Sequence, residues 1–248
     1  DAPQLPPHQP LAGAAGLVLL PEAGDAGREL LGREGLQLGQ LALPLESADA
    51  GDVLLRLLQL VLKLPLLTVE LCLGDSVEEA IIAAAGIAKK TLYAHFPSKN
   101  ALIAEVLRER DRRFRASLEA CVDREGDALA RLEAVFRWHG QWFSEAGFAG
   151  CMFLNVAAEF HGEVAELQAI AREHKQALEA YLAGLLALLV GEGDATGLAA
   201  EFNLLLDGAI GTALVRGDGL AAERAWGIGR RLVRDLRNLA VANNLGVS

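Results

Sequence analysis

The chain has 248 residues, of which 52% are hydrophobic, and its formal net charge is −10. This length and apolar content suffice for a buried core in one large domain or two smaller ones. The acidic balance excludes a protein that coats its surface in nucleic acid, because phosphate binding draws on Lys and Arg, so any nucleic-acid site must be local.

The chain has three widely spaced cysteines, Cys72, Cys121 and Cys151. Their odd number and spacing predict neither a disulfide framework nor a Cys-x-x-Cys metal site, and they favour a reducing, cytoplasmic location. We expect no secretory signal, because no basic start precedes an apolar run. The most apolar stretch, residues 53–73, is interrupted by charged residues and a proline, so no membrane span is predicted.

Residues 1–50 are crowded with Leu, Gly, Ala and Pro, and they show no sustained helical or strand period. They are predicted to be a poorly ordered extension that does not carry the function. Residues 1–75 also lack Ile, Phe, Tyr, Trp, Met and Asn, so an alternative is that this segment is translated from a wrong frame or start site. Residues 52–64 can form a helix, which Pro65 should end.

Residues 76–96 predict two short helices across a tight turn. The first begins at a Ser76 cap and ends at Gly86. The second buries Leu92 and Phe96 at four-residue spacing. The residues left to face outward on it are Lys89, Lys90, Thr91, Tyr93 and His95. This pattern is typical of a helix-turn-helix, whose second helix fits the DNA major groove.

A long helix is predicted to follow over residues 98–122, leading out of the helix-turn-helix into the core. Ser98 should cap it, and Lys99 then lies in a first turn whose backbone N–H groups can bind a phosphate. Residues 87–115 hold eight basic and three acidic side chains, a local basic surplus in an acidic protein.

Residues 85–102 read Ala-Gly-Ile-Ala-Lys-Lys-Thr-Leu-Tyr-Ala-His-Phe-Pro-Ser-Lys-Asn-Ala-Leu, and this string resembles the signature of the TetR family of bacterial regulators. The resemblance extends over roughly residues 76–240. It implies a DNA-binding region at residues 51–97, with an atypical first helix, and a ligand-binding and dimerisation domain at 98–248. It also implies that Lys89, Lys90 and Thr91 approach base edges or nearby phosphates. The residues that would hold the DNA backbone are Ser76, Tyr93, His95 and Lys99.

From residue 76 onward the sequence predicts an all-α fold, because no alternating strand pattern of useful length is present. The turns are expected at Gly86, Pro97, Gly126, Gly140, Gly147, Gly150, Gly162, residues 191–194 and residues 217–219. By family analogy, helices near 198–215 and 221–239 build a four-helix homodimer interface; ordinary packing within one chain is the alternative. The small residues expected to allow close helix approach are Ala199, Ala200, Gly208, Ala209, Gly211 and Ala213.

Aromatic and polar side chains concentrate between residues 136 and 160. A mostly apolar wall with a few polar groups suits a small-molecule pocket, although any single residue of it can be plain core. We expect an apolar or aromatic inducer to bind near Trp138, Trp142, Phe153 and Asn155. Cys151 is an alternative electrophile sensor, but beside Met and Phe it is more often inert core.

The resulting hypothesis is a cytoplasmic, homodimeric repressor that an inducer releases from double-stranded operator DNA. One alternative is a TetR-like dimer that has lost DNA binding and acts as a ligand-binding or interaction module. An enzyme with a helical metal site is disfavoured, because His139, His161 and His174 lack the Glu-x-x-His spacing that such bundles use. No metal and no cofactor is expected.

Overall fold

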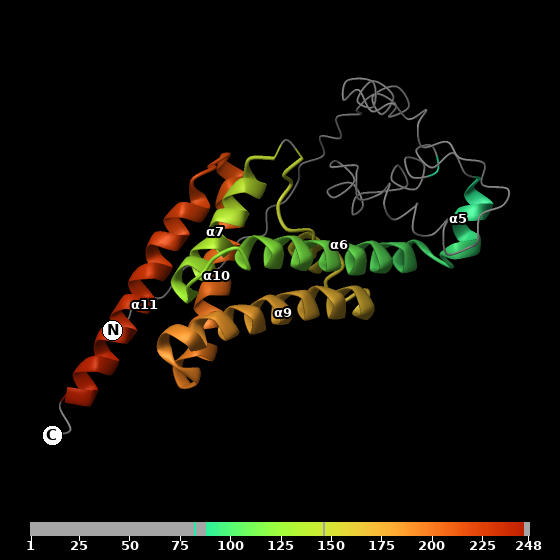
Figure 1. Cartoon of the computed structure of the whole chain (residues 1–248). Helices are drawn as coiled ribbons and strands as arrows, with labels where there is room; N and C mark the ends of the chain where they lie inside the picture. Colours follow the sequence, from blue (N-terminus) through green and yellow to red (C-terminus); the bar gives the residue numbers. More distant parts are fainter. Residues whose placement is uncertain (1–81, 83–87, 146, 246–248) are drawn as a thin grey trace, which may run out of the picture. The chain divides into compact units, whose positions relative to one another are not determined.

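The computed structural model describes residue 82 and residues 88–145 and 147–245, which fold into helices without any strand (Figure 1). The predicted all-α fold is confirmed for this part of the chain. The extension at 1–50, the helix at 52–64, the first helix of the helix-turn-helix and Ser76 lie outside the described residues. The helices are α5 (Lys89–His95), α6 (Lys99–Val122), α7 (Ala128–Phe143), α8 (Met152–Glu159), α9 (Ala165–Val190), α10 (Glu192–Arg216) and α11 (Ala221–Leu245).

Helix α5 is the predicted second helix of the helix-turn-helix, and its bounds agree with the sequence pattern. Leu92 and Phe96 are buried, as their four-residue spacing predicted. The chain leaves α5 in extended backbone at Phe96 and enters α6 at Ser98, whose Oγ accepts a hydrogen bond from the Ala101 N–H at 3.1 Å. The predicted Ser98 cap is therefore confirmed.

We call α5 and the turn up to Ser98 the head, and the helices from α6 to α11 the body. Helix α6 starts beside the head and packs against α7 and α9 (Figure 1). Its apolar side chains recur at helical spacing on one face. The buried ones are Leu102, Ile103, Ala104, Val106, Leu107, Leu118 and Val122. Phe114, predicted on the same face, is half-buried against this core. One continuous helix thus leads from α5 to the contacts with α7 and α9.

Helices α7, α9, α10 and α11 form the rest of the body, with α10 packed against the other three. The Phe136 ring is 5.7 Å from that of Phe202 and 5.6 Å from that of Trp226, measured between centroids. Gly229 lets α11 approach α10 closely, because a Cβ there would lie 2.8 Å from Phe202 Cζ. These contacts join α7, α10 and α11 into one core.

One predicted turn is wrong, and one is shorter than predicted. Gly140 lies inside α7, where a Cβ would stand 3.5 Å from the Cβ of Ala222, so this glycine serves helix packing. In the cluster at 191–194 only Gly191, with φ of +85°, lies between two helices: it ends α9, and α10 starts at Glu192. Gly217 ends α10 in the left-handed conformation (φ +63°) that glycine adopts without strain.

The small residues of α10 divide between two faces. Ala199, Ala209 and Ala213 are buried in the chain's own core, so for these three the alternative of packing within one chain is correct. Gly208 and Gly211 are exposed on the other face. Helix α10 is also apolar and long enough to cross a membrane by length and composition. The apolar residues on one face of α10 pack against α7, α9 and α11.

Candidate functional site

Five of the seven residues predicted to meet DNA lie on α5. Lys89, Lys90 and Tyr93 are exposed, and the Lys89 Nζ lies 5.9 Å from the centre of the Tyr93 ring. Thr91 and His95 are half-buried on the same short helix. This arrangement leaves basic and hydroxyl groups outside and the apolar anchors inside.

Lys99 is half-buried in the first turn of α6, next to the Ser98 cap. Lys99 follows α5 in the sequence, and only residues 96–98 separate the two. The first backbone N–H groups of a helix have no partner within the helix, and they favour anions.

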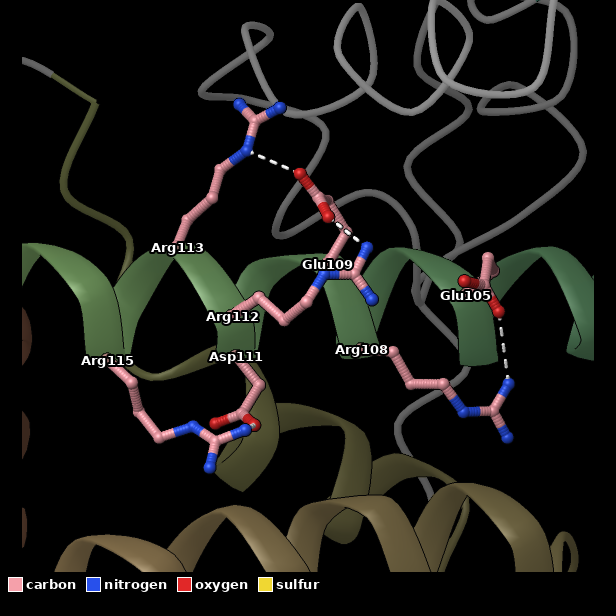
Figure 2. Close-up of polar contacts among 7 residues, drawn as sticks. All are labelled: Glu105, Arg108, Glu109, Asp111, Arg112, Arg113 and Arg115. Carbon is pink, nitrogen blue, oxygen red and sulfur yellow. Dashed lines mark hydrogen bonds and ion pairs between the residues drawn. The ribbon is translucent and has the colours of Figure 1, made fainter. Parts of the chain in front are cut away.

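Four of the five arginines between residues 108 and 115 form ion pairs with carboxylates (Figure 2). Arg108 pairs with Glu105 at 3.2 Å and with Glu166 of α9 at 2.7 Å. Each of the other pairs lies within α6: Arg112 and Arg113 with Glu109, and Arg115 with Asp111. The three lysines at the α5 end of α6 differ in exposure: Lys89 and Lys90 are exposed, and Lys99 is half-buried.

A second candidate site is a cavity of about 20 Å³ inside the body, enclosed by residues from α6 to α10. That volume holds about one water molecule. Its lining consists of Arg110, Phe114, His139, Trp142, Cys151, Met152, Phe153, His174, Lys175, Leu178 and Ile210. Aromatic and aliphatic surfaces thus surround a few polar groups, as in ligand pockets, but the volume is far smaller than that of such pockets.

Two of the four predicted ligand-binding residues, Trp142 and Phe153, line this cavity, and the other two do not. The Trp138 indole N–H instead donates to Ser117 Oγ at 3.0 Å. The Asn155 amide donates to the Ala149 carbonyl at 3.4 Å. Trp138 remains close, because its ring centre is 6.0 Å from that of Trp142.

His139 is the most deeply buried polar group of the cavity lining, with 0% of its surface exposed. Its Nδ1 lies 2.8 Å from the Val135 carbonyl. Burial lowers the pKa of His139 to about 4, against the smaller opposing effect of that hydrogen bond. The ring is therefore neutral at pH 7. A carbonyl only accepts, so the single proton sits on Nδ1, and Nε2 is left as an acceptor.

His174 joins α9 to α6 at the cavity wall. Its Nδ1–H donates to Asp111 Oδ1 at 2.7 Å, and its ring stacks on Phe153 with centroids 3.7 Å apart. Burial lowers the pKa of His174, and the Asp111 hydrogen bond opposes that shift. Because Asp111 also pairs with Arg115, this contact couples the pocket to the polar face of α6.

Arg110, on the same helix, also lines the cavity, and no sequence signal separated it from its neighbouring arginines. Burial lowers the pKa of its guanidinium, partly offset by the charge of Glu145. Among the described residues no hydrogen bond or salt bridge to Arg110 is found. In the same part of the chain, no group of three or more His, Cys, Asp or Glu is placed to hold a metal ion.

Comparison with known proteins finds similarity both in sequence and in fold. Residues 78–106 match the model of the bacterial regulatory proteins of the tetR family. A TetR-family transcriptional regulator from Streptomyces coelicolor is 28% identical with a TM-score of 0.65, over 75% of this chain and 96% of that one. A TetR transcriptional regulator from Streptomyces avermitilis is 25% identical with a TM-score of 0.59, over 78% and 98% of the two chains.

The fold is shared more widely than the sequence. A TetR-family regulator from Cytophaga hutchinsonii has a TM-score of 0.65 at only 16% identity, over 77% of this chain and 97% of that one. No curated protein matches the chain at a significant level.

Proposed function

This chain belongs to the TetR family of bacterial transcriptional regulators, and from that premise we propose that it is a repressor released from its operator by a small molecule. It would bind double-stranded DNA as a homodimer in the cytoplasm, without catalytic activity. Residues 51–97 would form the DNA-binding region and residues 98–248 the ligand-binding and dimerisation domain.

The observation that carries this proposal is the course of α6. The helix starts at the Ser98 cap beside α5, and its Arg110 and Phe114 line the body cavity. At 1.5 Å of rise per residue, Lys99 and Phe114 are about 22 Å apart along the helix. A displacement of the cavity wall therefore reaches the head through one continuous element.

DNA recognition is assigned to α5 and its flanks. Lys89, Lys90 and Thr91 are proposed to reach base edges or nearby phosphates from the major groove. The residues proposed to hold the sugar-phosphate backbone are Ser76, Tyr93, His95 and Lys99. The exposure of Lys89, Lys90 and Tyr93 supports their access to DNA.

Selection of duplexes from a random pool by the purified chain tests the DNA-binding proposal. We expect enrichment of a palindromic sequence with two half-sites, because a two-fold dimer presents two copies of α5. Lys89→Ala, Lys90→Ala and Thr91→Ala should each change the preferred bases, whereas Arg172→Ala, on the exposed surface of α9, should not. A pool without enrichment would instead favour a ligand-binding dimer that has lost DNA binding.

Dimerisation is assigned to the outward faces of α10 and α11. On α10, Leu204, Gly208, Gly211 and Val215 recur at spacings of four, three and four residues, and we call this set the α10 stripe. Leu204 is 72% exposed and Val215 83% exposed. On α11, Ile228 and Leu239 are exposed as well. Apolar side chains and glycines on one open face are what close helix packing between two chains requires.

Inducer binding is assigned to the body cavity and its surroundings, with Trp142 and Phe153 in the wall and Trp138 and Asn155 next to it. Because the cavity has room for about one water molecule, a ligand must enlarge it. Release of DNA requires that the enlarged form disfavours the DNA-binding arrangement of the two heads. A difference of a few kcal/mol in ligand affinity between the two forms would move most of the population.

A further inference from the structure

The two helices of the proposed dimer face carry opposite charges. Helix α10 contains four acidic side chains and one basic side chain, Arg216. Helix α11 contains five arginines and two acidic side chains. Interfaces between proteins are arranged so that positive groups of one chain meet negative groups of the other. The charge of α10 therefore suits α11 of a second copy better than it suits a second α10.

A groove of about 420 Å³ lies between α10 and α11. Leucines and glycines form the apolar part of its lining, and every charged side chain in the lining is acidic. These acidic side chains are Asp194, Glu201 and Asp235. Such a groove fits the side chain of an arginine, because the methylene stem can cover apolar surface while the guanidinium binds a carboxylate.

Glu201 is the carboxylate of this groove that has no partner in its own chain. It is exposed, and among the described residues it makes no ion pair or hydrogen bond. Asp235 pairs with Arg234 at 3.0 Å, and Asp194 lies in the first turn of α10, where the helix dipole favours an acidic side chain. Glu201 stands three residues before Leu204, so it lies in line with the α10 stripe.

Arg231 is the matching cation on α11. Ile228 stands three residues before it and Leu239 eight residues after it, a spacing that places all three on one side of the helix. Ile228 and Leu239 are the exposed apolar side chains already assigned to the dimer face. Arg231 is exposed as well, and it makes no ion pair or hydrogen bond within the described part of the chain.

The other four arginines of α11 are excluded by their partners or by their position. Arg224 and Arg234 each pair with an aspartate of the same chain. At 3.6 residues per turn, Arg230 and Arg237 lie about 100° and about 120° around the helix from Arg231. Each half of the proposed interface thus contributes one unpaired charge, Glu201 on α10 and Arg231 on α11.

We propose that Glu201 of one copy pairs with Arg231 of the other, and that these two symmetric pairs make the chain select its own copy as partner. The inference rests on the proposed dimer face and names what sets the choice of partner. A two-fold interface contains each contact twice. Closing the interface removes water from both side chains, and a charge that loses water without meeting an opposite charge is destabilising. A partner with a neutral or like-charged residue at either position is therefore disfavoured.

Reversing the two charges in separate chains tests the pairing. In the Glu201→Arg homodimer two basic groups face each other at both contacts, and in the Arg231→Glu homodimer two acidic groups do. Each homodimer should have a dissociation constant at least about tenfold higher than wild type. A dimer of one variant chain with the other joins opposite charges at both contacts, so it should be as stable as wild type. The double variant should also dimerise as wild type does.

Native mass spectrometry of full-length chains that differ in tag mass measures the fraction of mixed dimers, and sedimentation gives the dissociation constants. A tenfold loss in each homodimer predicts about nine-tenths mixed dimers, against about one half for random pairing. Arg230→Glu mixed with Glu173→Arg is the matched control and should pair at random, because these exposed charges lie on another face of α11 and on α9. A mixed dimer of the test variants also shows that both of them fold.

Three results separate this inference from the proposed function. Random mixing of Glu201→Arg with Arg231→Glu would overturn the pairing and leave the dimer face in place. Loss of both homodimers without mixed dimers would place the two residues in the interface but not opposite each other, which also overturns the pairing. A wild-type chain that stays monomeric at micromolar concentration would refute the dimer itself.

Discussion

Replacing Gly211 by arginine should convert the proposed dimer to monomers and weaken binding to a palindromic duplex by roughly 100-fold or more, because the second half-site is then no longer bound by a linked head. Gly211 lies in the α10 stripe, and apart from its chain neighbours and the backbone of its own helix no described atom lies within 4 Å of the position its Cβ would take. The monomer therefore has room for the arginine, and replacing a helical glycine is favourable by up to about 1 kcal/mol. Only a partner chain across the stripe would meet the new charge.

Gly184→Arg is the matched control, because Gly184 is also an exposed helical glycine with open space around it, but on α9. Sedimentation velocity gives the mass, and fluorescence anisotropy with a labelled duplex gives the affinity. If Gly211→Arg sediments as a dimer with wild-type affinity, the interface lies on another face. If Gly184→Arg also dissociates, the effect is not specific to the stripe.

The free energy of unfolding should fall by about 3 kcal/mol between pH 6.5 and pH 4 through His139 alone. Burial is the main cause, since it lowers the pKa of His139 from 6.5 to about 4. Well above pH 6.5 neither state holds the proton, and the stability is fully present. As the pH falls from 6.5 to 4, the unfolded chain binds the proton and the folded chain does not, so unfolding becomes easier. The lowered pKa of His174 acts in the same direction.

Urea unfolding at fixed protein concentration, at pH 7, 5.5 and 4, measures this effect. His139→Phe should lose most of the His139 contribution, so its stability should fall less with acid than that of wild type. His161→Gln, which changes an exposed histidine, should follow the wild-type curve. Parallel curves for wild type and His139→Phe would contradict a buried neutral His139.

Local patterns predicted the head and the start of α6 closely. The four-residue spacing of Leu92 and Phe96, and a serine after proline, each depend only on near neighbours, and the structure places these residues as expected. The long α6 followed from its continuous apolar period. Such features depend on capping residues and on the spacing of apolar residues, and both can be identified in the sequence.

Features set by tertiary contacts were not predictable from the sequence. As a glycine, Gly140 predicted a turn, but in the structure it lies in a helix that packs closely against Ala222. Arg110 is one of five arginines within eight residues, and only the fold turns it toward a cavity while its neighbours meet carboxylates. His139 lies three residues before Trp142 on α7, a spacing that places them on one face, but its unpaired Nε2 depends on neighbours from other helices.

The salt dependence of binding to a selected duplex, compared between wild type and Lys99→Ala, tests the assignment of DNA binding to the head most directly. Each lysine that neutralises a phosphate releases counterions, which contributes about 0.9 to the slope of log affinity against log salt. We expect a steep slope for wild type and a decrease of about one unit per copy for Lys99→Ala, with all sequences weakened alike. Binding that does not depend on salt, or an unchanged slope in Lys99→Ala, would contradict the phosphate contact at the start of α6.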